Sequence, residues 1–294
     1  MGAAEEPGGP GFLYEELCDD AGYFVRAGEL LEKGESAWQS YEVWDTPQFG
    51  KLFRLDGCFM TSERDEFYYH ENLIHASAII HPGLRRALII GGGDGGSAEE
   101  ILKYRSVEQV VIAELDEKVI ELSRRHLQAV HHGALDDPRV NIRIGDGMAY
   151  VREQGKDGGD RYDLIVLDLT DPVGPAEALY SAEFFRDCKA LLSPGGALTL
   201  HIGSPVYIPE RVRELVQRLR TLFAVVRPYF LYMPLYGSLW GLASASDTLD
   251  PLSESAAEID RRLAERAIVK LQHYNGAVHH AQFALPNHLR TLLA

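Results

Sequence analysis

The chain has 294 residues, of which 46% are hydrophobic and 25% charged, proportions typical of a globular protein that buries a substantial core. Its formal net charge of -15 argues against binding to nucleic acid or to an anionic membrane, because both are negatively charged, and is compatible with a cationic substrate. The three cysteines are scattered without a C-x-x-C pair, and the sequence has neither an apolar run long enough to span a membrane nor a signal-peptide core. These features predict a cytoplasmic protein with free thiols and no membrane partner.

The first part of the chain predicts a flexible N-terminus followed by a small antiparallel β domain. Residues 1–11 are rich in Gly and Pro, which favours flexibility. Residues 12–61 carry short, alternating apolar segments. Asp56 and Gly57 separate two of these segments with the dipeptide most typical of a β-hairpin turn.

Residues 62–294 predict a Rossmann-like domain that carries the chemistry. A helix over residues 63–80 comes first, with Ser62 and Asp65 resembling a capping box. From residue 86 onward strands and helices alternate, which is typical of an α/β fold with a doubly wound, mostly parallel sheet. The expected strands cover residues 87–90, 110–114, 140–144, 164–168 and 197–201, and the expected helices cover residues 98–104, 118–126, 148–154, 182–192, 210–222 and 256–273.

A glycine turn follows the first strand of this domain. Gly91, Gly93 and Gly96 fit the spacing G-x-G-x-x-G, and Ser97 stands near the expected N-cap of the next helix. Such a turn joins a strand to a helix with no side chains to keep a ligand away from the backbone. Alone, the motif serves nicotinamide cofactors, flavins and adenosyl-sulfonium donors equally.

Carboxylates stand at four predicted strand ends: Asp94, Glu114, Asp146 and Asp168. Ligands of open parallel sheets bind at these ends, and an acid about 20 residues past the glycine turn, as Glu114 is, can bind ribose hydroxyls. The pyrophosphate of a dinucleotide would be repelled by so many acids. The site therefore favours a nucleoside without phosphates and a ligand that carries positive charge.

Each acid also has a plain structural interpretation. Glu114 could be an ordinary strand-end acid, Asp146 could cap the following helix, and Asp171 with Pro172 is a good turn starter. Asp168 is harder to explain in this way, because it follows the apolar residues 164–167 and so emerges from the sheet core. Burial there would raise the pKa of its carboxyl group, which suits a proton acceptor.

Six motifs together carry a family resemblance. The chain resembles the polyamine aminopropyltransferases, the spermidine synthase family, from about residue 38 to the C-terminus. That resemblance implies an α/β fold of the adenosylmethionine-methyltransferase type preceded by a small antiparallel β domain. The motifs are TSERDEFYYHE at residues 61–71, GGGDG at 91–95, AELD at 113–116, GDG at 145–147, DLTDPVGP at 168–175 and FALP at 283–286.

The resemblance implies a reaction and a set of site residues. The family transfers an aminopropyl group from decarboxylated S-adenosylmethionine, a co-substrate, to an amine, with no prosthetic group and no metal. The implied partner is a small polyamine and not nucleic acid, and the implied assembly is a homodimer or homotetramer. By position, Glu114 resembles the ribose ligand, Asp146 and Gly147 resemble the adenine contacts, and Pro175 resembles a residue that encloses the nucleoside. Gln39, His70 and Asp94 resemble ligands of the donor or the polyamine. Asp168 resembles the proton acceptor, and the lining of the acceptor channel is represented by Asp171, Tyr69 and Tyr236.

The chain departs from the usual spermidine synthase pattern on the acceptor side. His201 stands where these enzymes usually carry Gln, and residues 234–240 are one residue shorter than the usual segment. Putrescine is the leading acceptor, with spermidine or agmatine as the alternative. An adenosylmethionine-dependent methyltransferase would need groups for the donor's carboxylate. A nicotinamide oxidoreductase is disfavoured by Asp94, and a polyamine-binding protein would not need Asp168 and Asp171 together.

Overall fold

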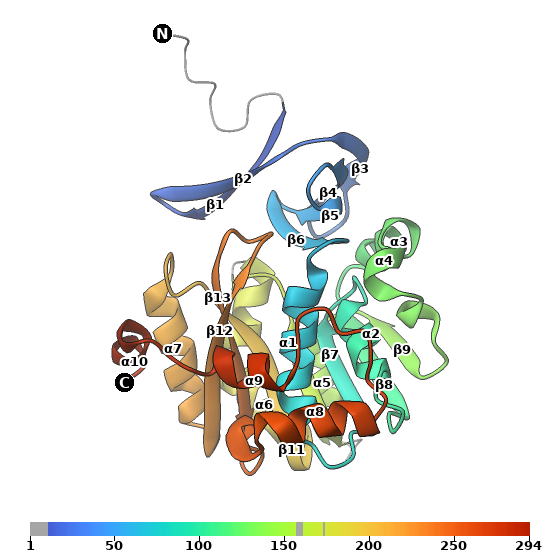
Figure 1. Ribbon diagram of the computed structural model, residues 1–294. Coiled ribbons are helices and arrows are strands. Elements are labelled where there is room, and N and C mark those ends of the chain that lie inside the picture. Colours follow the sequence, from blue (N-terminus) through green and yellow to red (C-terminus); the bar gives the residue numbers. More distant parts are fainter. Residues whose placement is uncertain (1–10, 157–160, 173) are drawn as a thin grey trace.

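The computed structural model describes residues 11–156, 161–172 and 174–294, and for residues 174 and 175 the backbone alone. A central sheet lies between two layers of helices, and the first six strands lie together over one end of it (Figure 1). The predicted flexible N-terminus, apart from Gly11, lies outside the described residues. Within the described part of the chain, no helix is long and apolar enough to cross a membrane.

The N-terminal strands form two antiparallel sheets. Asp56 and Gly57, both with positive φ, connect paired Leu55 and Cys58, so the predicted hairpin turn is confirmed. These sheets pack against helix α3 (Glu117–His126) through Val43 and Phe53, and against Leu235 through Leu52 and Phe59. The strands are β1 (Phe12–Cys18) paired with β2 (Ala21–Arg26), and β3 (Glu29–Glu35), β4 (Ser40–Thr46), β5 (Gly50–Leu55) and β6 (Cys58–Ser62) in that order.

The central sheet has the order β12-β13-β11-β10-β7-β8-β9. The five neighbouring strands β11, β10, β7, β8 and β9 are parallel. The predicted α/β fold class is therefore confirmed. The chain runs outward in both directions from the neighbours β7 and β10, so their carboxyl ends form the switch point where such sheets bind ligands. The strands are β7 (Arg86–Gly91), β8 (Gln109–Glu114), β9 (Val140–Ile144), β10 (Tyr162–Asp168), β11 (Leu192–Gly203), β12 (Val225–Met233) and β13 (Ser238–Ser246).

Two apolar cores hold the helices on the two faces of this sheet. One contains residues of α1, α2 and α8, and the other contains residues of α5, α6, α7 and α10. The helices are α1 (Glu66–Ala78), α2 (Gly96–Leu102), α3 (Glu117–His126), α4 (Gln128–His131), α5 (Gly147–Lys156), α6 (Ala182–Leu191), α7 (Pro209–Arg220), α8 (Ala256–Glu265), α9 (Gly276–Gln282) and α10 (Asn287–Leu292), with 3-10 turns at Ala134–Asp136, Gly174–Tyr180 and Pro251–Ser253.

The start of α1 differs from the prediction. The helix begins at Glu66 rather than at residue 63, and no side chain caps it. The Ser62 hydroxyl donates a hydrogen bond to Asp65 Oδ1 (2.5 Å), and Asp65 Oδ2 accepts one from the backbone N–H of Leu235 (2.7 Å). Asp65 therefore fastens α1 to the β12–β13 connection, which carries Tyr236.

The helix predicted over residues 256–273 corresponds to α8 and is shorter than predicted. It ends at Glu265, because Ala267 adopts a positive φ of 54° and the N–H of Ile268 reaches back to the carbonyl of Leu263 (2.9 Å). The backbone beyond this break donates three hydrogen bonds, from residues 272–274, to the carboxylate of Glu71. Glu71 is buried, and a buried carboxylate requires hydrogen-bond donors. The hydrogen bonds that residues 272–274 donate to it are incompatible with continuation of the helix.

Candidate active site

The glycine turn after β7 makes room for side chains of the site. At Gly91 (φ 78°) an added Cβ would lie 2.2 Å from the carbonyl oxygen of Asp168, and at Gly96 it would lie 2.2 Å from the ring of His70. At Gly93 it would lie 2.8 Å from Glu114 Oε2. The three glycines of the motif therefore let acids and a histidine from three other elements approach the turn.

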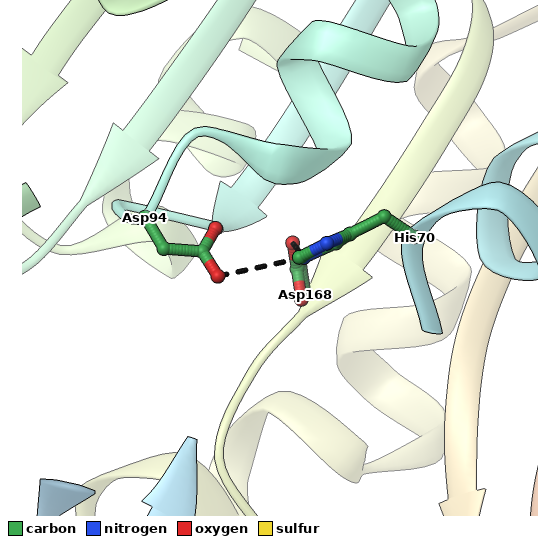
Figure 2. Close-up of side chains that lie close together, drawn as sticks. All are labelled: His70, Asp94 and Asp168. Carbon is green, nitrogen blue, oxygen red and sulfur yellow. Dashed lines mark ion pairs between the residues drawn. The ribbon is translucent and has the colours of Figure 1, made fainter. Parts of the chain in front are cut away.

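His70, Asp94 and Asp168 meet beside this turn (Figure 2). His70 Nε2 lies 3.4 Å from Asp94 Oδ2 and 4.0 Å from Asp168 Oδ2, and His70 Nδ1 lies 2.8 Å from Glu66 Oε2. Burial opposes protonation of His70, but the charges of Asp94 and Glu66 outweigh it and raise its pKa well above the ordinary value. The group is thus an imidazolium held among three carboxylates, and its net charge is negative.

The donor atoms of His70, Asp94 and Asp168 lie within 4.8 Å of one another, a spacing that could hold a metal ion. Both ring nitrogens of His70 are already engaged, however, with Glu66 on one side and Asp94 on the other. A protonated imidazole has no lone pair for a metal. A cationic group of an organic substrate suits this cluster better than a metal does.

Asp168 at the end of β10 is largely buried, with 11% of its side chain exposed, in keeping with the apolar run before it. Burial and the nearby charge of Asp94 raise its pKa to about 6, against the opposing effects of His70, Ser97 and Tyr69. The Ser97 hydroxyl donates a hydrogen bond to Asp168 Oδ2 (2.7 Å). Ser97 therefore stabilises the ionised form of Asp168, and it is not the N-cap of α2, which is Gly95.

Glu114 and Gln39 lie on the β8 side of the turn. Burial raises the pKa of Glu114 to about 7, and its Oε1 accepts the N–H of Asp116 (2.9 Å). Gln39 Nε2 donates to Asp116 Oδ2 (3.0 Å), and Ser36 donates to the same oxygen (2.6 Å). Because Gln39 comes from the N-terminal sheets, these bonds fix that part of the chain against the end of β8.

The structure gives different surroundings to the three remaining predicted donor contacts, Asp146, Gly147 and Pro175. Asp146 is exposed and accepts the N–H of Met148 (2.8 Å), so the structure shows its helix-capping role at α5. Gly147 is buried, and a Cβ there would lie 2.7 Å from Ile90 Cγ2. Pro175 belongs to the 3-10 turn Gly174–Tyr180, but its side chain lies outside the described residues.

On the other side of Asp168, aromatic rings line the site. The ring of Tyr69 stands edge-on to those of His70 (5.2 Å between centroids) and Tyr236 (6.2 Å), and Tyr236 Oη donates to the carbonyl of Met60 (2.9 Å). A small cavity reaches all three rings. Tyr69 also hydrogen-bonds to Asp168 and lies 6.5 Å from the ring of His201.

Asp171 lies at the far end of this aromatic wall. Its Oδ1 is 3.9 Å from His201 Nδ1, and its Oδ2 is 3.2 Å from Arg211 Nη1. Tyr69 and His201 thus connect Asp168 to Asp171, and the two acids belong to one site.

Several residues of the site were not predicted from the sequence. Glu66 could have been found from its i, i+4 spacing to His70 on a helix. Ser97 and Arg211 gave no local signal, because their partners are 71 and 40 residues away. Glu15 of β1 also faces this side, and burial together with the charge of Asp171 raises its pKa to about 7.

Comparisons with known proteins define the class of this molecule. A family model described as the spermine/spermidine synthase domain matches residues 66–255. A crystal structure of spermidine synthase in complex with the transition state analogue AdoDATO aligns with a TM-score of 0.89 and 33% identity over 100% of this chain and 98% of that chain. The spermidine synthase of Thermotoga maritima gives a TM-score of 0.86 and 32% identity over 100% and 97%.

Curated relatives agree with the solved structures. The polyamine aminopropyltransferase of Nitrosomonas europaea is 48% identical over 100% of this chain and 91% of its own length, and polyamine aminopropyltransferase 2 of Hyperthermus butylicus is 38% identical over 90% and 86%. The chain belongs to the spermine/spermidine synthase family. It is an aminopropyltransferase, and the predicted family is confirmed.

Proposed function

We propose that this enzyme transfers an aminopropyl group from decarboxylated S-adenosylmethionine to putrescine, giving spermidine and methylthioadenosine. The observation that carries the proposal is Asp168, a largely buried carboxylate with a pKa of about 6 at the switch point of the sheet. A base of this strength accepts a proton near neutral pH and can pass it on. The crystallised relative with AdoDATO supports a sulfonium donor of this class.

The donor side of the site consists of the glycine turn and the ends of β8 and β9. Glu114 would bind the ribose hydroxyls, and Asp94 with His70 would lie next to the aminopropyl tail. The cluster of Glu66, His70, Asp94 and Asp168 carries net negative charge, which attracts the sulfonium and the terminal ammonium of the donor. We assign the remaining donor contacts to Gln39, Asp146, Gly147 and Pro175.

The acceptor side must produce an amine that can attack. Amines of this type have a pKa of about 10, so near pH 7 both ends are protonated and lack a lone pair. Asp168 takes a proton from the near nitrogen, which then forms a bond to the carbon next to sulfur. The carbon–sulfur bond breaks, its electron pair stays on sulfur, and neutral methylthioadenosine leaves. Asp171 holds the far ammonium, and Tyr69 and Tyr236 line the path between the two ends.

Spermidine or agmatine is the alternative acceptor, because the departures at His201 and residues 234–240 lie on the acceptor side. The test is incubation with decarboxylated donor and each amine in turn, with products identified by mass spectrometry. We expect spermidine from putrescine at the highest kcat/KM. A higher kcat/KM with spermidine or agmatine would make that amine the acceptor in place of putrescine. Methylation of an amine with intact S-adenosylmethionine would mean that the enzyme is a methyltransferase.

We also propose that the enzyme works in the cytoplasm as a homodimer or homotetramer. Free thiols at Cys18, Cys58 and Cys188 support a reducing compartment. Exposed apolar side chains on the N-terminal sheets, Phe24 at 60% and Leu30 at 41%, support assembly through that region. Sedimentation equilibrium of the purified chain would test the assembly, and a monomer at micromolar concentration would contradict it.

A further inference from the structure

His201 on β11 has a defined tautomer and one unused nitrogen. Its Nε2 lies 2.9 Å from the carbonyl oxygen of Leu169 and 2.5 Å from Tyr180 Oη. A carbonyl can only accept, so Nε2 carries the hydrogen. Burial lowers the pKa of His201 and so favours the neutral ring, although the charge of Asp171 opposes this effect. Nδ1 therefore presents a lone pair, and it has no hydrogen-bond partner among the described residues.

This unused nitrogen faces Asp171. His201 is only 3% exposed, and its Nδ1 lies 3.9 Å from Asp171 Oδ1. Both atoms are hydrogen-bond acceptors and cannot bond to each other. A single ammonium group that lies about 2.9 Å from His201 Nδ1 and from Asp171 Oδ1 could donate a hydrogen bond to each of these atoms, because their separation allows both bonds with acceptable geometry.

A second unpaired polar atom belongs to the neighbouring ring of Trp240. Trp240 stacks on His201 with ring centroids 6.0 Å apart and planes inclined by 26°, and its indole Nε1 is also buried without a partner in the part of the chain described. Buried polar atoms in proteins are nearly always paired, so unpaired atoms on two neighbouring rings are consistent with a site that a ligand completes. The stack fixes the ring of His201 and holds its Nδ1 toward Asp171.

Arg211 on α7 already uses the other oxygen of Asp171. Its Nη1 donates to Asp171 Oδ2 (3.2 Å), and both side chains are partly exposed, at 32% and 41%. The guanidinium shares the charge of the carboxylate and repels any second cation that approaches it. Arg211 therefore reduces the attraction that Asp171 can offer to an ammonium group.

We propose that His201 Nδ1 and Asp171 Oδ1 together bind the far ammonium of the acceptor amine, and that Arg211 sets the strength of this binding by competing for Asp171. The proposal rests on the proposed function and names two specificity-determining residues within it. It gives His201 the role of an uncharged acceptor and gives Arg211 that of an internal competing cation. Together they would make the site selective for the charge at the far end of the amine.

The first test replaces the competing cation. Arg211→Gln removes the charge and retains a polar side chain, and Arg213→Gln is the matched control, because Arg213 is an exposed arginine of the same helix. We expect Arg211→Gln to lower the KM for putrescine about two- to five-fold, the range of a partly exposed ion pair, and Arg213→Gln to leave it unchanged. An unchanged or higher KM in Arg211→Gln would overturn the role of Arg211.

The charge at the far end of the amine provides the decisive contrast. Butylamine is putrescine without its second amino group, so its far end is an uncharged methyl group. Its inhibition constant against putrescine is measured in both variants. The proposal requires that Arg211→Gln leave the binding of butylamine unchanged. A gain in affinity equal to that of putrescine would mean that Arg211 acts on the whole channel, and would contradict the proposal.

The second test removes the unused nitrogen. His201→Phe retains a ring to stack on Trp240, and His201→Gln retains an oxygen acceptor. We expect His201→Phe to raise the KM for putrescine about 10- to 100-fold, the effect of losing one hydrogen bond to a charged group, with little change for butylamine, and His201→Gln to restore most of the loss. Equal losses for both amines would overturn the role of His201.

The activity of the wild type and the amine discrimination of the variants test the proposed reaction and the roles of His201 and Arg211 separately. If the wild-type chain forms no aminopropyl product with any amine, the proposed function fails. If the wild type is active but neither variant changes discrimination between putrescine and butylamine, only the present inference fails. Where His201→Phe does not fold, as judged by thermal melting, the Arg211→Gln measurement with butylamine still decides.

Discussion

The two halves of the site are built differently. On the donor side, carboxylates bond to backbone N–H groups two residues away: Glu114 to Asp116, Asp116 to Lys118, and Asp146 to Met148. On the acceptor side, Asp168 and Asp171 bond to side chains of distant elements, Ser97 on α2 and Arg211 on α7. The donor-side acids thus have local backbone partners, which Ser36 and Gln39 supplement at Asp116, whereas the acceptor-side acids depend on how distant elements pack.

This contrast explains where variation can occur within one reaction. Acids held by bonds to nearby backbone N–H groups are less sensitive to substitution of distant side chains, which suits a donor common to all acceptors. An acceptor site held by side chains can be retuned by a single substitution on another element. The departures at His201 and residues 234–240 lie on that second side.

The largest expected effect is that of removing the proton acceptor. Asp168→Asn keeps the hydrogen bond from Ser97 but cannot accept a proton, so we expect kcat to fall about 10²- to 10⁴-fold. Donor binding, measured by calorimetry, should largely persist. Asp20→Asn, at an exposed turn, is the control and should retain full activity. Turnover near the wild-type level in Asp168→Asn would remove Asp168 from the mechanism.

A smaller effect is expected at the donor side. Glu114→Gln should weaken donor binding about 10- to 100-fold, because a neutral amide is a poorer ligand for ribose hydroxyls than a carboxylate. Glu117→Gln, an exposed neighbour in the first turn of α3, should not change it. If the KM for the amine rose while donor affinity stayed constant, the division of the site into two halves would be wrong.

The same variant should also change stability in a pH-dependent way. The pKa of Glu114 is raised from 4.5 to about 7 in the folded chain, so between these values the folded state binds more protons than the unfolded state. Stability conferred at this position is therefore lost as the pH rises from 4.5 through 7. We expect Glu114→Gln to melt at a higher temperature than the wild type at pH 8, with the difference vanishing near pH 4.5.

The difference between the halves also explains what the sequence could predict. The parallel strands, the glycine turn and the largely buried position of Asp168 follow from apolar runs and turn residues that are local in the chain. The break at Ala267 did not, because it depends on Glu71, which is nearly 200 residues away. Arg211 was missed for the same reason, since its ion pair depends on how α7 packs beside the end of β10.

The smallest expected effect tests how packing tunes Asp168. With a pKa of about 6, Asp168 should give kcat/KM an acidic limb near pH 6, below which activity is lost because the base is protonated. The hydroxyl of Ser97 favours the ionised carboxylate, so Ser97→Ala should move this limb upward by about one pH unit, the effect of losing one hydrogen bond to a charged group. Above pH 8 the two enzymes should differ little. Ser193→Ala, which removes a hydroxyl that donates to Asp163 at the opposite end of β10, is the control and should leave the limb in place. A limb that does not move in Ser97→Ala would mean that Asp168 is not the group that titrates there.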